Sequence, residues 1–238
     1  MTDHIVQAFD TELEAITQQI SELGQLAERQ LTDAVWALRH ASKELAESVK
    51  SQDTQMDRLA ARIEEEAISL IARRQPLAVD LRHVMAAIRI AANLERAGDL
   101  ASNIAKRVIA MAPHKLPDAF AEPLQRMVDL ALLQLHDAGE AFAKRDAQQA
   151  QGVWEHDATI DALHTLLFQD IVEAMTDDQV PALDLAHLLF VIKNIERIGD
   201  HATNIAENVV YLVSGAAPTQ DRPKQDESSS LAQLSPKR

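Results

Sequence analysis

Apolar residues recur at steps of three and four along almost the whole chain, which is the period of an amphipathic α-helix. In the first segment they are Leu13, Ile16, Ile20, Leu23, Leu31, Val35 and Leu38. The pattern is interrupted by short stretches of turn-forming residues, such as APHKLP and TDDQVP. It therefore predicts six long helices, at about residues 5–38, 43–75, 77–112, 118–144, 147–175 and 182–213.

The second half of the chain repeats the first. Ser42 and Asp146, two residues suited to begin a helix, are 104 residues apart. The stretch NLERAGDLASNIA begins at Asn93, and NIERIGDHATNIA begins at Asn194. These two stretches agree at 9 of 13 positions and are 101 residues apart. The two spacings differ by three residues, so we expect a short deletion near Pro181.

Long helices joined by short turns pack side by side. The repeat therefore predicts an all-α fold of two tandem antiparallel three-helix bundles, at 1–113 and 114–215, placed end to end. Residues 216–238 are rich in proline, serine and charge, and they contain little to bury. This composition is typical of a disordered tail.

Composition narrows the possible functions. The chain has 47% hydrophobic but only 3% aromatic residues, a mixture that favours packed helices. The absence of cysteine excludes disulfides and thiolate chemistry. A formal net charge of −14 argues against nucleic acid as a partner. Neither a signal peptide nor a membrane-spanning run is found, so a soluble, cytoplasmic protein is expected.

The repeated stretches and the helices that precede them carry pairs of carboxylates at a spacing of four. At this spacing the two side chains lie on one face of a helix and repel each other. The eight residues are Asp53, Asp57, Glu95 and Asp99 in the first half, and Asp157, Asp161, Glu196 and Asp200 in the second. An asparagine follows four residues after the last acid of each half, at Asn103 and Asn204.

If the two acidic faces of a bundle meet, four carboxylates and an asparagine share one patch. Such a patch needs protons, arginines or cations, and hard multivalent cations suit oxygen ligands. The sequence therefore predicts a cation site in each bundle. Gly98 and Gly199 precede an aspartate within helices, where glycine costs about 1 kcal/mol relative to alanine. Either close helix packing or room beside a metal explains them.

Other signals are weaker. Histidine follows aspartate by three residues at His83, His164 and His187, but only His164 adjoins a predicted ligand, Asp161. No Glu-x-x-His pair, phosphate-binding loop or nucleophile motif is present, so no catalytic residues are predicted. The basic ARRQP stretch is a candidate partner contact. Two other functions remain open, a carboxylate-bridged metalloenzyme and a structural scaffold with solvated carboxylates.

The doubled N-[LI]-E-R-x-G-D-x-x-x-N-I motif, the IARRQPLAVDLRHV segment and the D-x-x-x-D pairs resemble the PhoU family over residues 1 to about 215. The resemblance implies two three-helix bundles, and in some members of the family the acidic pairs hold multinuclear clusters of iron or other metals. Iron is the expected metal, with zinc, manganese, magnesium and nickel as alternatives. All eight carboxylate positions of the family pattern are filled in this chain.

The resemblance also implies a role that spacing does not show. Proteins of this family restrain phosphate-responsive genes when phosphate is plentiful, and they have no established enzymatic activity. They are thought to connect the nucleotide-binding subunit of a phosphate ABC transporter with the sensor histidine kinase of a two-component system. The resemblance therefore implies a cytoplasmic homodimeric adaptor, which reaches the membrane only through its protein partners.

Overall fold

The structure is a computed structural model that describes residues 2–176 and 180–216. These residues form six α-helices and no β-strand. The helices are α1 (Thr2–His40), α2 (Lys43–Arg74), α3 (Val79–Met111), α4 (Asp118–Lys144), α5 (Ala147–Ala174) and α6 (Ala182–Ser214). The fold is therefore all-α, as the apolar periodicity predicts. The predicted disordered tail lies, apart from residue 216, outside the described residues.

The turns after α1 and α4 are built in the same way. The side chains of Ser42 and Asp146 accept hydrogen bonds from backbone N–H groups at the start of the next helix. Both residues therefore act as N-caps, as predicted. Immediately before them, Ala41 and Arg145 adopt left-handed conformations with φ of 51° and 54°. A residue in this conformation closes the last turn of a helix.

The start of the third helix differs from the prediction. It begins at Val79, and Pro76 lies in the connection before it rather than in its first turn. Gln75 and Ala78 both have positive φ, at 49° and 51°. The backbone therefore changes direction twice between α2 and α3, and this path leaves no room for a helical turn at Leu77.

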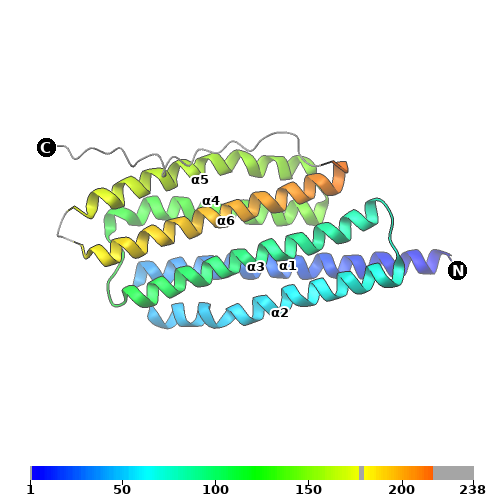
Figure 1. Cartoon of the computed structure of the whole chain (residues 1–238), viewed down its shortest axis with the longest axis horizontal. Coiled ribbons are helices and arrows are strands. Elements are labelled where there is room, and N and C mark those ends of the chain that lie inside the picture. Colours follow the sequence, from blue (N-terminus) through cyan, green and yellow to red (C-terminus); the bar gives the residue numbers. More distant parts are fainter. Residues whose placement is uncertain (1, 177–179, 217–238) are drawn as a thin grey trace.

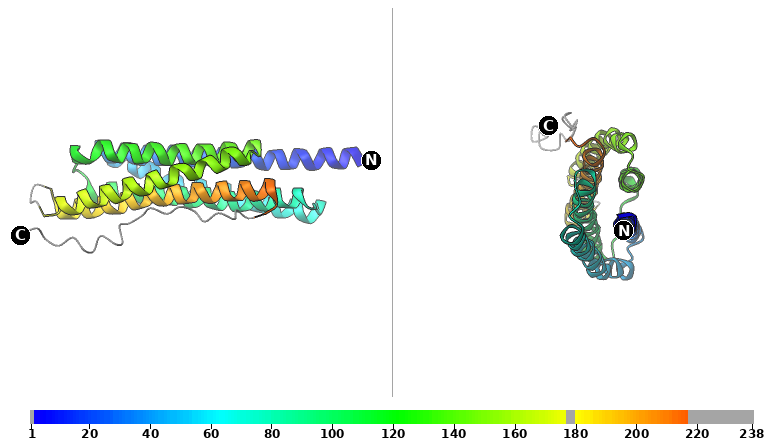
Figure 2. Two further views of the ribbon diagram at one scale, coloured as in Figure 1. Left: turned by 90° about the horizontal axis from the view of Figure 1, so that it is seen from above. Right: turned by 90° about the vertical axis from the view of Figure 1, so that its right-hand side faces the viewer.

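The two three-helix bundles, α1–α3 and α4–α6, lie side by side (Figure 1). The expectation that they are placed end to end is wrong. Helix α3 packs along α6, and α1 packs along α4, while α2 and α5 form the two outer edges. The end-on view in Figure 2 shows α1 and α4 together on one side of the α3–α6 pair.

The width of the buried face explains this arrangement. A helix on the surface of a bundle buries one stripe of residues. In α3, however, adjacent residues are both buried, as at Ala86 and Ala87, and again at Ala101 and Ser102. Helix α3 therefore buries more than the stripe that contacts α1 and α2, and the additional face is covered by α6. Alanine-rich positions do not reveal this extra face in the sequence.

Polar and cation–π contacts cross the boundary between the antiparallel helices α3 and α6. His201 Nδ1 lies 2.9 Å from Asn93 Oδ1. Further along, the guanidinium of Arg107 lies 4.3 Å from the centre of the Phe190 ring. These contacts join helices that are about a hundred residues apart in the chain, so the two bundles form one packed unit.

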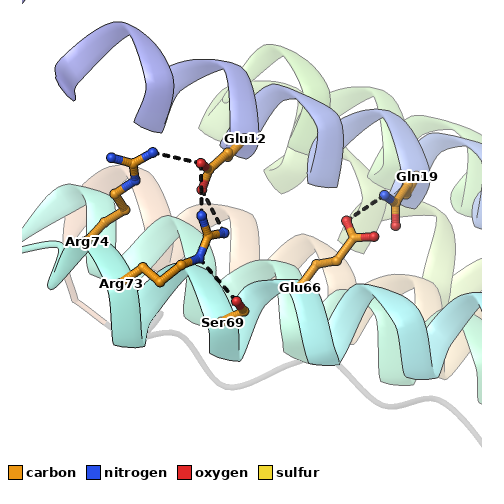
Figure 3. A network of polar contacts seen from close by, with 6 residues as sticks. All are labelled: Glu12, Gln19, Glu66, Ser69, Arg73 and Arg74. Carbon is orange, nitrogen blue, oxygen red and sulfur yellow. Dashed lines mark hydrogen bonds and ion pairs between the residues drawn. The ribbon is translucent and has the colours of Figure 1, made fainter. Parts of the chain in front are cut away.

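The arginines of the ARRQP stretch are used inside the first bundle (Figure 3). Arg73 and Arg74 both bind the carboxylate of Glu12 in α1, at 3.0 and 2.8 Å. The hydrogen bond from Arg74, with that from Arg73, holds the pKa of Glu12 below its usual value. Nearby, Gln19 donates to Glu66 at 2.7 Å. This end of α2 is therefore tied to α1, and its arginines are already paired.

Candidate metal centre

The first bundle brings its predicted acidic residues together. Asp53 and Asp57 lie on α2, and Glu95 and Asp99 lie on α3. One carboxylate oxygen each of Asp57, Glu95 and Asp99 lie within 4.8 Å of one another. Asp57 and Asp99 are exposed, whereas Asp53 and Glu95 are half-buried. The group is therefore open to solvent on one side and rests against protein on the other.

The electrostatics of this group show a surplus of negative charge. Burial, followed by the charges of Asp99 and Asp57, raises the pKa of Glu95. Burial, followed by the charge of Asp99, also raises the pKa of Asp53, although the charge of Lys106 opposes this. A carboxylate whose pKa is raised by its neighbours is stabilised by a nearby cation, because the cation favours the ionised form.

The donor set fits a hard cation. The Oδ1 atom of Asp53 is buried and accepts no hydrogen bond from any residue that the structure describes. A buried carboxylate oxygen without a donor is costly unless a proton or a metal ion meets it. Asp57, Glu95 and Asp99 supply further oxygen ligands of the kind that magnesium, manganese and iron accept.

Gly98 lies on the core side of this group. A Cβ atom built on it would stand 2.8 Å from Met56 Cε and 2.9 Å from Gln30 Oε1. Met56 is the residue before Asp57, as Gly98 is the residue before Asp99. The glycine therefore lets α2 approach α3 beneath the carboxylates. Of the two explanations for the glycine, the structure supports close helix packing, because the missing side chain would point at Met56 and Gln30.

Two glutamines that were not predicted from the sequence take part in this packing. Gln30 in α1 and Gln134 in α4 are fully buried and are 104 residues apart. Gln134 Nε2 donates to the carbonyl of Val153, and its Oε1 lies 2.8 Å from a Cβ position on Gly199. Their repetition at the same offset as Ser42 and Asp146 is the signal that reveals them.

The second bundle holds its acidic residues in a different environment. Asp157 and Asp161 of α5 are buried, as is Glu196 of α6, whereas Asp200 is half-buried. The Nζ atom of Lys193 lies 2.9 Å from Glu196 Oε2. Helices α5 and α6 pack along each other, as α2 and α3 do in the first bundle. The acidic helix pair is therefore repeated, but its surroundings are not.

The remaining candidates have other partners or lie elsewhere. Asn103 accepts a hydrogen bond from Lys106 at 3.0 Å. His164 is buried in α5, one turn beyond Asp161. His83 packs edge-on against Phe142, and burial lowers its pKa to about 4, so it is a neutral core residue at physiological pH.

The family model of the PhoU domain matches the chain twice, over residues 20–108 and 124–209. The chain belongs to the PhoU family. Each matched PhoU segment contains one acidic helix pair, together with the glycine that lies beside it.

Curated PhoU relatives match nearly the whole chain. The phosphate-specific transport system accessory protein PhoU homolog of Rhizobium meliloti (strain 1021) is 47% identical, over 97% of this chain and 98% of the relative. The homolog of the same name from Caulobacter vibrioides (strain NA1000 / CB15N) is 40% identical, over 95% of this chain and 98% of the relative. These names describe accessory proteins rather than enzymes, which agrees with the prediction that the chain has no catalytic role.

Solved PhoU structures share the fold. The crystal structure of PhoU from Pseudomonas aeruginosa has a TM-score of 0.83 at 34% identity, and covers 87% of this chain and all of that one. The phosphate transport system regulatory protein PhoU from Streptococcus pneumoniae has a TM-score of 0.82 at 32% identity, and covers 89% of this chain and all of its own. Within residues 2–176 and 180–216, no helix has the length and apolarity needed to cross a bilayer.

Proposed function

We propose that this protein is a cytoplasmic regulator of phosphate uptake and of the phosphate-starvation response. It restrains the response when phosphate is plentiful. Similarity to PhoU proteins along nearly the whole chain is the observation that carries this proposal. The relatives are named as accessory proteins of a phosphate-specific transport system, which is a role of contact rather than of chemistry.

In this proposal the protein acts as an adaptor. Its partners are the nucleotide-binding subunit of a phosphate ABC transporter and the sensor histidine kinase of the phosphate two-component system. It works as a homodimer and reaches the membrane through these partners, because its net charge of −14 opposes direct binding to anionic lipids. At the turn after α2 the arginines are bound to Glu12, so the exposed side chains of Leu77 and Val79 are better candidates for contact.

The adaptor also binds metal ions at its acidic helix pairs. The oxygens of Asp57, Glu95 and Asp99, within 4.8 Å of one another on two helices, support this part. A bound cation would hold α2 and α3 together at the point where their carboxylates repel. The metal is therefore a structural element of the adaptor, with iron as the first candidate and zinc, manganese, magnesium and nickel as the others.

Deletion of the gene tests the regulatory role. Phosphate-starvation genes should stay switched on in phosphate-rich medium, and the full chain supplied in trans should restore repression. Residues 1–215 should restore it as well, since both segments matched by the family model end before residue 215. Normal repression in the deletion strain would overturn the role, whereas failure of the truncated chain alone would refute only the statement about the tail.

A further inference from the structure

The residues around the carboxylates differ between the two bundles, although the carboxylates themselves repeat. In the first bundle a groove of about 310 Å³ runs beside Asp57 and Glu95, between α2 and α3. Much of its wall consists of alanine. The other lining residues are Ala60, Ala61, Glu64, Ile88, Ala91 and Ala92. The small side chains leave the carboxylates accessible from solvent.

The equivalent positions in the second bundle hold larger side chains. In the outer helix the offset is 104, so Ala60 and Ala61 correspond to His164 and Thr165. In the inner helix the offset is 101, so Ala91 and Ala92 correspond to Ile192 and Lys193. Glu64 of the outer helix corresponds to Phe168. Bulkier side chains therefore stand at the positions that line the groove of the first bundle, and the carboxylates of the second bundle are more buried. Asp157 is 3% exposed and Asp161 is 6% exposed.

Lys193 brings a positive charge to the solvent-facing edge of this second group. Its Nζ lies 2.9 Å from Glu196 Oε2, and Glu196 is 7% exposed. The equivalent of Lys193 in the first bundle is Ala92, which is exposed and carries no charge. A buried carboxylate is tolerated only when an opposite charge or several hydrogen-bond donors compensate for the lost hydration. Lys193 supplies such a charge from the chain itself.

The first bundle also has a lysine near its acids, and its position differs. Lys106 lies two turns beyond Asp99 on α3, and its Nζ donates to Asn103 Oδ1 at 3.0 Å. The positive charge of Lys106 acts to lower the pKa of Asp53, which lies at one end of the group. It makes no ion pair with Asp57, Glu95 or Asp99 among the salt bridges of the described residues. It therefore does not replace a cation between the two helices.

We infer that the two acidic helix pairs are unequal cation sites. The pair in the first bundle is open and binds exchangeable cations. The pair in the second bundle carries its own counter-ion, Lys193, which competes with a metal for Glu196. This inference rests on the proposed binding of metal ions, and it adds that removal of metal acts mainly on the first bundle.

Equilibrium dialysis of the full chain against Mn²⁺, with the bound metal counted by mass spectrometry, tests the inference. Asp57→Asn with Asp99→Asn leaves only the second site intact, and Asp161→Asn with Asp200→Asn leaves only the first. The protein that retains the first site should bind Mn²⁺ about tenfold more tightly, a difference typical of altered groups around metal ligands. Circular dichroism confirms that each variant is folded.

Lys193→Met removes the charge of the lysine and keeps its apolar stem. In the protein that retains only the second site, this change should strengthen Mn²⁺ binding about tenfold. Lys193→Arg keeps the charge and should leave Mn²⁺ binding weak. Lys106→Met is the matched control, and it should not change the Mn²⁺ affinity of the second site. If Lys193→Met unfolds that protein, the comparison of the two site-deleted proteins still decides the question.

The outcomes separate this inference from the proposed function. Equal Mn²⁺ affinity in the two site-deleted proteins, or unchanged affinity in folded Lys193→Met protein, would overturn the inequality while leaving metal binding in place. Absence of Mn²⁺ binding by the unaltered chain would overturn the inference together with the metal-binding part of the proposed function.

Discussion

The side-chain oxygen Oε1 of Gln30 lies 2.9 Å from the place where a Cβ atom on Gly98 would stand. Met56 Cε is 2.8 Å from the same place. Helices α1 and α2 therefore both press against α3 at a residue that has no side chain. The carboxylates of Asp57 and Asp99, each next to one of these contact residues, are brought together as a result.

Replacing Gly98 with alanine should destabilise the protein. Overpacking of a core costs roughly 1–3 kcal/mol, and the better helix propensity of alanine returns about 1 kcal/mol of this. We expect a net loss of about 1 kcal/mol, because Met56 and Gln30 are flexible enough to yield in part. Urea denaturation of the metal-free protein measures the change.

Gly139 and Gly152 are matched controls for this substitution. Both lie within helices, and a Cβ atom on either would meet nothing within 4 Å. Alanine at these positions should stabilise the protein by about 1 kcal/mol through helix propensity alone. A similar gain in Gly98→Ala would mean that the close approach of Met56 and Gln30 does not limit the packing.

Local sequence signals predicted the helices well. The N-caps at Ser42 and Asp146 and the periodic apolar positions depend on residues close together in the chain, so the sequence shows them directly. The side-by-side arrangement of the bundles depends instead on how wide the apolar face of α3 and α6 is. Alanine and glycine suit both buried and exposed positions, so the sequence does not show how wide that face is.

The carboxylate positions of the first bundle were also accessible from the sequence, because a spacing of four places two side chains on one helix face. The difference in burial between the two acidic pairs was not. It depends on side chains of a second helix, such as Ala60 of α2, which only the packed helices bring beside Glu95. The buried Gln30 was missed because a single polar residue in an amphipathic helix is commonly exposed.

Ala41→Gly should stabilise the protein. Ala41 closes α1 in a left-handed conformation with φ of 51°, in which alanine is strained and glycine is not. Relief of that strain, less the extra chain entropy of glycine, should raise the free energy of unfolding by about 0.5–1 kcal/mol. The same glycine substitution at Ala61, exposed in the middle of α2, should instead lower it by about 1 kcal/mol.

Thermal unfolding of Ala41→Gly and Ala61→Gly, compared with the unaltered chain, checks both signs. A loss of stability in both variants would contradict the left-handed turn at Ala41. The equivalent residue Arg145 is a less clean test, because its charge at the end of α4 also interacts with the helix dipole.

The stability of metal-free protein should depend on pH through Asp53 and Glu95. Their pKa values are raised from ordinary values of 3.8 and 4.5, so the folded state holds protons that the unfolded state has released. The stabilisation from these protons is fully present below the ordinary pKa values and is lost as the pH rises through the raised ones. Acidification should therefore favour the fold through this pair.

A comparison with Asp53→Asn plus Glu95→Gln isolates this effect from other acids. In the presence of chelator, the stability of the unaltered chain relative to this variant should fall as the pH rises from about 4 to 7. The opposite trend would show that the two carboxylates are stabilised in their ionised form without metal. The pKa of Glu12 is instead lowered, mainly by Arg74. Its contribution to stability should therefore be present at neutral pH and be lost as the pH falls through the lowered pKa.

Removal of metal should lower the melting temperature. A ligand that binds only the folded state stabilises it by roughly 2.7 kcal/mol at one hundred times its dissociation constant. A chelator should abolish this gain, and Asp99→Ala with Asp200→Ala, which removes one ligand from each acidic pair, should abolish the response to chelator. Calorimetry with Fe, Mn, Zn and Mg added in turn measures the shift and identifies the metal with the largest effect.

Asp10→Asn is the matched control for this measurement, since Asp10 is an exposed carboxylate on α1 outside the acidic pairs. It should retain the full response to chelator. Without metal, the protein with Asp99→Ala and Asp200→Ala should be at least as stable as the unaltered chain, because the substitutions relieve repulsion between carboxylates one helical turn apart. Identical melting with and without chelator for every metal would show that protons, solvent and, in the second bundle, Lys193 compensate the acidic pairs without a metal ion.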